Sequence, residues 1–143
     1  MPPYDLLLRL LLAAGLGAVL GVEREYRHKP AGLRTNILIS IGAALFTIVS
    51  IELTTGGGSG DRVAAQIVTG IGFLGAGAIL RHGATVQGMT TAATIWVNAA
   101  IGMAAGAGLL RLAIATTMLT IAVLFGLPFI EALFEDRPKI DRP

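Results

Sequence analysis

The chain has 143 residues, of which 54% are hydrophobic and only 14% are Asp, Glu, Lys or Arg, against roughly 25% charged residues in a soluble domain. The formal net charge is +2 and the basic residues lie between apolar runs, which argues against nucleic-acid binding. The absence of cysteine excludes disulfides and thiolate chemistry. The composition therefore predicts one integral membrane domain with almost nothing outside the bilayer.

Five apolar runs approach the length of about 20 residues that a membrane-spanning helix needs. In chain order they cover roughly residues 5–22, 33–53, 63–80, 92–110 and 112–133. Charged or glycine-rich breaks separate them, and Pro128 either kinks the last helix or marks its exit from the bilayer. We expect an all-α bundle of about five transmembrane helices over residues 1–134, followed by a short charged cytoplasmic tail over 135–143.

The lysines and arginines fix the expected topology. Cytoplasmic loops carry an excess of basic residues, and most basic residues fall on one side if the loop over residues 23–34 is cytoplasmic. The sequence therefore predicts an N-terminus outside and a C-terminus inside.

Glycine-rich faces indicate where helices pack, because helices in lipid associate through close backbone approach. The residues concerned are Gly17 and Gly21 in the first run, Gly70, Gly72, Gly75 and Gly77 in the third, and Gly102 and Gly106 in the fourth. The glycines of the third run point to two sides, so we expect that helix to lie centrally. We expect the fifth, rich in Leu and Ile, at the periphery.

Polar residues also recur at helical spacing. Asn36 and Ser40 share a face of the second run, Thr94 and Asn98 a face of the fourth, and Gln66 lies on a similar face of the third. Two interpretations stay open at this point. These residues could join helices by hydrogen bonds, or they could line a polar cavity between three helices.

A second polar group gathers at the predicted cytoplasmic ends of the helices. Its members are Glu23, Arg24, Arg34, Thr35, Asn36, Arg81, Thr90 and Thr91. Helix N-termini and arginines favour anions, so this end resembles an anion site or a dock for an acidic partner. We expect Arg24, Arg27 and Lys29 to reach lipid headgroups, and Glu23 to pair with Arg34 or Arg81.

Metal binding and catalysis have little basis in these residues. Mg²⁺ is usually held by one or two carboxylates with waters, and Glu23 is the candidate ligand although the spacing places no second carboxylate beside it. No nucleophile–base pair is visible, so we expect no enzyme. We also expect no cofactor, Mg²⁺ being the one ion that the pattern leaves open.

Three blocks of sequence form a longer pattern over roughly residues 13–108. The first is GAVLGVERE at 17–25 with Arg27 and AGLRTN at 31–36. The second is RVAAQIV at 62–68 with GIGFLGAG at 70–77. The third contains Arg81, Gly83, Val86 and Gly88, then TAAT at 91–94 and Trp96. In order and spacing this pattern resembles the MgtC/SapB family of bacterial inner-membrane proteins.

The resemblance implies a bacterial inner-membrane protein linked to growth at low Mg²⁺ and to regulation of the ATP synthase. The resemblance also implies that the signature residues of the family are, in this chain, Glu23, Arg24, Arg34, Thr35, Asn36, Gln66, Arg81, Thr91, Thr94 and Trp96. Many virulence-type members of the family have a soluble C-terminal domain, and several have Asn and Cys where this chain has Thr90 and Val97. We therefore expect a core-only member, for which a virulence role is not implied.

Two functions follow as hypotheses. The first is a non-enzymatic regulator that acts through its small-residue faces on another membrane protein, such as the ATP synthase. In that case leucine at Gly102 or Gly106 is expected to abolish partner capture without unfolding. The alternative is a small Mg²⁺ or anion transporter or channel that acts as a homo-oligomer. Besides lipids, a second copy is an expected partner in both cases, with a dimer favoured because glycine faces point to several sides.

Overall fold

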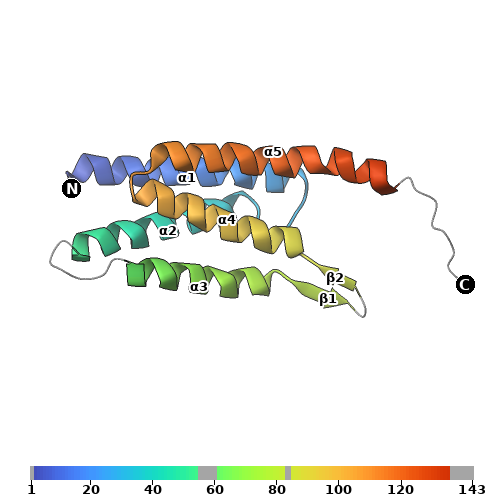
Figure 1. The fold of residues 1–143 in the computed structure, drawn as a ribbon, viewed down its shortest axis with the longest axis horizontal. Coiled ribbons are helices and arrows are strands. Elements are labelled where there is room, and N and C mark those ends of the chain that lie inside the picture. The colour runs from blue at the N-terminus through green and yellow to red at the C-terminus, as the bar shows by residue number, and fades with distance from the viewer. Residues whose placement is uncertain (1, 55–60, 83–84, 136–143) are drawn as a thin grey trace, which may run out of the picture.

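The computed structural model shows five helices and one short β-hairpin, stacked side by side along a common direction (Figure 1). It describes residues 2–54, 61–82 and 85–135. The elements in chain order are α1 (Pro3–Tyr26), α2 (Leu33–Thr54), α3 (Asp61–Gly77), β1 (Leu80–His82), β2 (Thr85–Gln87), α4 (Met89–Gly106) and α5 (Leu110–Glu135).

The predicted five-helix, all-α architecture is confirmed. By length and composition α1, α2 and the Leu110–Ile130 part of α5 could cross a membrane, whereas α3 and α4 are shorter, with 17 and 18 residues. Successive helices run in opposite directions, so the chain ends at the opposite end of the bundle from its start (Figure 1). Which end is cytoplasmic stays a prediction. Residues 136–143 of the predicted tail lie outside the described residues.

One predicted boundary is wrong. The apolar run 63–80 does not stay helical to its end, because α3 ends at Gly77 and Leu80 pairs with Gln87 in an antiparallel hairpin. The return into α4 needs a left-handed residue, and Gly88 supplies it with φ of +90°. The hairpin therefore takes the place of the last helical turn of that run.

A short loop reverses the chain between α1 and α2, and side chains fix it. The Asn36 side-chain amide donates to the carbonyls of Ala31 and Gly32, and the Glu25 carboxylate accepts from the backbone N–H of Leu33. The bond from Leu33 satisfies one of the N–H groups that a helix start leaves unpaired, and the bonds from Asn36 hold the carbonyl groups of the loop. They fix α2 close beside the end of α1.

Arg9 closes the opposite end of the bundle. Its guanidinium donates to the Gly106 carbonyl at 2.9 Å and pairs with Asp5, also at 2.9 Å. A cation at the last carbonyls of α4 suits the negative end of the helix dipole. Gly108, with φ of +80°, then turns the chain into α5.

Glycines bring α2 into backbone contact with helices on both of its sides. A methyl group at Gly17 of α1 would lie 2.7 Å from the Asn36 carbonyl oxygen, and one at Gly21 would lie 2.6 Å from the Leu33 Cα. On the other side, methyl groups at Gly102 and Gly106 of α4 would lie 2.3 and 2.4 Å from carbonyl oxygens of α2. Four glycines thus leave room for the backbone of one helix.

The expectation that α3 lies centrally is wrong. The central elements are α2 and α4, while α3 lies at one edge of the bundle, opposite α1 and α5 (Figure 1). A methyl group at Gly70, Gly72 or Gly77 would meet nothing within 4 Å, and only Gly75 of the four faces a neighbour, Ala92 of α4. Glycine spacing alone does not tell a contact within the chain from an open surface.

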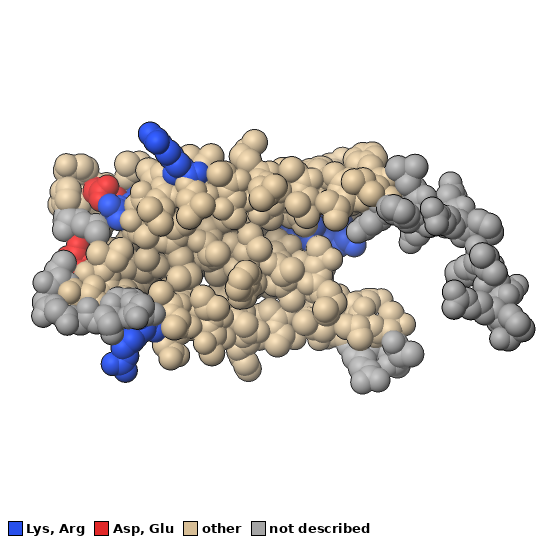
Figure 2. All heavy atoms as spheres, in the orientation of Figure 1, with Lys and Arg blue, Asp and Glu red and all other residues tan. Residues whose placement is uncertain are grey.

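The exterior is apolar, as a membrane protein requires. Leu38, Phe73 and Leu119 are more than 65% exposed, whereas the core combines alanines with larger side chains such as Leu20 and Ile101. Figure 2 shows the middle of one face covered by uncharged residues, with the charged side chains toward the ends. A surface of this kind fits hydrocarbon rather than water.

We predict that Gly102→Ala destabilises the fold by about 2 kcal/mol, because overpacking against a rigid backbone forces the helices apart. The measurement is the free energy of unfolding in detergent micelles, followed by helical circular dichroism. Gly42→Ala is the matched control, since a methyl group there meets nothing within 4 Å. Equal stability of the two variants would contradict the close contact.

Candidate functional site

Polar side chains from three helices are buried together where α1, α2 and α4 meet. Each is less than 5% exposed. The residues are Glu23 and Arg24 of α1, Asn36 and Ser40 of α2, and Thr91, Thr94 and Asn98 of α4. We call this set the buried polar cluster.

Two asparagines join α2 to α4 at the centre of the cluster. The Asn98 side-chain amide donates to the backbone carbonyl of Asn36 at 2.7 Å and to its side-chain oxygen at 3.0 Å. Because Asn36 also holds the loop before α2, one residue links the α1–α2 turn to α4. Each such bond between helices in a membrane contributes roughly 0.6 kcal/mol on average.

Two buried oxygens of the cluster have no hydrogen-bond partner among the described residues. They are the Ser40 hydroxyl and the side-chain oxygen of Asn98. Gly102 packs directly on the backbone of Ser40 in the same region. Close backbone packing therefore continues next to these oxygens.

Glu23 forms an ion-pair group at the end of α1 with arginines of the same chain segment and not with Arg34; the side chain of the other expected partner, Arg81, lies outside the described residues. Its carboxylate accepts from Arg24 at 2.6 and 3.1 Å and from Arg27 at 3.0 Å, whereas Arg34 is exposed. Arg24 is 3% exposed and so does not reach lipid headgroups, contrary to the expectation. Arg27 lies four residues after Glu23 and therefore on the same face of α1, and the adjacent Arg24 also reaches the buried carboxylate.

The geometry at Glu23 bears on the candidate metal site. Both carboxylate oxygens already accept hydrogen bonds from guanidinium groups. In the described part of the chain no group of three or more His, Asp or Glu residues is placed to hold a metal ion. The arrangement is that of a structural ion pair.

Arg27 extends this group to α5. Its guanidinium lies 4.9 Å from the centre of the Phe125 ring. A cation over an aromatic face contributes about 0.5–1 kcal/mol at an exposed site. Sequence analysis missed this contact, because nothing in the spacing of the two residues brings α5 beside the end of α1.

Of the eight residues predicted at one end of the bundle, the seven with described side chains divide into two groups. Glu23, Arg24, Asn36 and Thr91 are buried and belong to the cluster. Arg34, Thr35 and Thr90 are exposed at the starts of α2 and α4. The backbone of Arg81 lies in β1, but its side chain falls outside the described residues.

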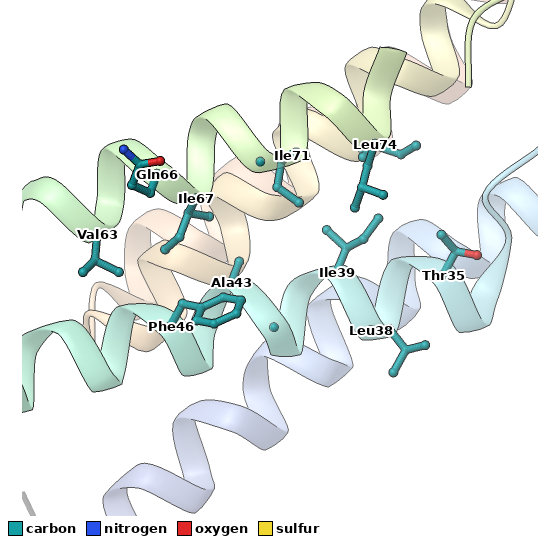
Figure 3. A pocket seen from close by; sticks show the side chains of 13 residues that line it. Thr35, Leu38, Ile39, Ala43, Phe46, Val63, Gln66, Ile67, Ile71 and Leu74 are labelled. Atoms are coloured by element: carbon teal, nitrogen blue, oxygen red, sulfur yellow. The ribbon is translucent and has the colours of Figure 1, made fainter. Parts of the chain in front are cut away.

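The polar stripes of α2 and α4 meet, but that of α3 does not join them. Gln66 is exposed and lines a cavity of about 790 Å³ between α2 and α3 (Figure 3). Apart from Gln66 and Thr35, the lining is apolar and includes Ile39, Ala43 and Ile67. We call this cavity the α2–α3 groove. Sequence analysis missed the groove because the sequence does not distinguish apolar side chains that face lipid from apolar side chains that line a groove.

The apolar exterior, the helices long enough to span a bilayer and the buried polar cluster together define a small polytopic membrane protein. A comparison with protein families matches residues 10–133 to the family described as MgtC family. The chain belongs to the MgtC family.

Curated relatives agree with this assignment. The chain is 54% identical over 108 residues to Protein MgtC of Brucella abortus, which covers 76% of this chain and 45% of the relative. It is 51% identical over 119 residues to Protein MgtC of Salmonella typhimurium, which covers 83% of this chain and 50% of the relative. It is also similar to an uncharacterized Synechocystis protein, at 48% identity over 132 residues, covering 92% of this chain and 56% of the relative.

The chain spans about half the length of the curated relatives it matches. No solved structure matches it. The comparisons therefore assign the membrane domain to a family, and the activity is a separate question.

We predict that Asn98→Ala lowers the free energy of unfolding by about 1 kcal/mol, because two hydrogen bonds between α2 and α4 are lost. Thr117→Val is the control, since the buried Thr117 hydroxyl bonds only within its own helix, to Ala113. Denaturant titration in micelles measures both variants. A larger loss for Thr117→Val than for Asn98→Ala would contradict the central role of Asn98.

We predict that Glu23→Gln costs about 3 kcal/mol, because it leaves the Arg24 guanidinium buried without a counter-charge. The double variant Glu23→Leu/Arg24→Met should recover most of that loss, since two apolar side chains need no partner. The same unfolding titration tests both. If the double variant is less stable than Glu23→Gln, burial of an unpaired charge does not explain the loss.

Proposed function

We propose that the chain is a non-enzymatic membrane protein that regulates another membrane protein by binding it within the bilayer. The partner packs against the outward side of α3. The structure supports this side because it carries small, exposed residues, and a methyl group at Gly72 would meet nothing within 4 Å.

The outer face of α3 carries the proposal. Ala65, Thr69, Gly72 and Ala76 follow one another at steps of four, three and four residues and are all exposed. This spacing keeps them on one face of the helix. Small residues at such spacing allow a second helix to approach closely, and the approach supplies most of the association energy in lipid.

The glycines of α4 cannot serve the partner, contrary to the sequence-based expectation. Gly102 and Gly106 are covered by the backbone of α2, so leucine at either position should disrupt the fold itself. The proposed regulatory surface therefore lies on α3 and not on α4.

The transporter alternative has less support. Polar side chains of α2 and α4 bond to each other, and glycines hold the helix backbones together beside them. The α2–α3 groove is lined almost entirely by apolar side chains, which do not replace the hydration shell of Mg²⁺ or of an anion.

The identity of the regulated protein rests on the family. Because the chain is an MgtC-family protein, we propose that it acts in the bacterial inner membrane during adaptation to low Mg²⁺, with the ATP synthase as partner. A second copy is an additional candidate for the same face of α3. None of these roles requires a bound cofactor.

The test is capture of the ATP synthase from bacterial inner membranes by the tagged full chain. We predict that Gly72→Leu lowers capture about tenfold, because the larger side chain introduces a misfit that costs about 1–3 kcal/mol of binding free energy at the helix contact. Gly15→Leu on α1 is the matched control, since a methyl group at either glycine meets nothing within 4 Å.

Equal capture by the wild type and both variants would count against the α3 surface. Flux of Mg²⁺ into liposomes that depends on the purified protein would favour the transporter instead. Chemical cross-linking of the purified protein detects self-association without the synthase, and so distinguishes it from capture of the synthase.

A further inference from the structure

The α2–α3 groove is long enough for an extended apolar ligand. Its lining on α2 runs from Thr35 to Phe46, which is roughly 16 Å along the helix.

The walls of the groove are also suited to hydrocarbon. Ile39, Ala43, Ile67 and Ile71 point into it from the two helices (Figure 3). An apolar cavity does not hold water well, and atoms that line an unfilled space lose dispersion contacts. In a membrane, lipid chains are the medium next to this opening.

One end of the groove can bind an anion. Thr35 lines that end, and the exposed Arg34 precedes it. At the start of α2, the N–H of Leu33 is bound by Glu25 and that of Asn36 by Gly32. The N–H groups of Arg34 and Thr35 have no acceptor in the described part of the chain, and free amides at a helix start favour phosphate.

The surrounding charges favour an anionic ligand. Lys29 and Arg34 are exposed at this end, whereas Glu23 pairs with Arg24 and Arg27. The other acidic side chain described at the α1–α2 loop is that of Glu25, which binds the Leu33 amide. Each basic residue near a bilayer surface favours anionic over neutral lipid.

We propose that the α2–α3 groove holds the acyl chains of an anionic phospholipid, whose phosphate is bound by Arg34 and Thr35 at the first turn of α2. The site lies on the side of α3 that faces α2, whereas the proposed regulatory surface lies on its outer side. Lipid and protein partners could thus bind α3 together.

A tryptophan reporter in the groove tests this site. The chain has one tryptophan, so Phe46→Trp in a Trp96→Phe background places the only tryptophan among the groove residues. The full chain is reconstituted into phosphatidylcholine vesicles that contain brominated phosphatidylglycerol or brominated phosphatidylcholine. A second reporter, Leu119→Trp in the same background, is the control, because Leu119 of α5 is 67% exposed.

We expect brominated phosphatidylglycerol to quench the groove reporter more strongly than brominated phosphatidylcholine, and the α5 reporter to be quenched equally by both. Arg34→Gln should lower the preference at the groove about fivefold, the effect of removing one interfacial cation. Arg111→Gln, an exposed arginine of α5, should leave it unchanged.

Filling the groove gives an independent result. Gly42→Leu should reduce quenching of the groove reporter by both lipids, while Gly15→Leu should not; both positions have open space for a side chain. Equal quenching by the two lipids would overturn the anionic site. A groove reporter that neither lipid quenches would show that protein occupies the groove, which also overturns the proposal.

Discussion

The backbone of α2 is the constraint on which the rest of the structure depends. Glycines of α1 contact it from one side and glycines of α4 from the other, so the three helices approach more closely than side chains would allow. At that separation the Asn98 side-chain amide donates to the backbone and side-chain oxygens of Asn36. Asn36 in turn holds the α1–α2 loop. Lipid offers no hydrophobic force between helices, so close packing and these bonds supply the association energy.

This arrangement uses most of the polar groups that a transport pathway would need. Asn36 and Asn98 bond to each other, and Glu23 is occupied by two arginines. At the edge of the bundle, α3 packs against α4 but contacts α2 only weakly, and it is exposed over much of its surface. The inner helices thus serve stability, and the edge helix is available for binding.

The two sides of α3 differ in the size of their side chains. Its outer face carries small side chains that suit a second helix, whereas the side toward α2 carries Ile67, Ile71 and Leu74 around an apolar groove. Shape rather than polarity separates the two, since both face hydrocarbon. A lipid in the groove would support α3 where its contact with α2 is sparse, and would therefore steady the face proposed for a partner.

The sequence by itself determined the class of protein, the five helices and most of the buried polar cluster. Hydrophobic length and polar spacing are local properties, so Asn36, Thr94 and Asn98 could be placed on helix faces without knowing which helices meet. The tertiary structure decided which glycine faces are filled: Gly17, Gly21, Gly102 and Gly106 meet α2, whereas Gly70, Gly72 and Gly77 remain open. It also decided that a groove exists between α2 and α3. These outcomes depend on distances between helices, which no spacing along a single helix contains.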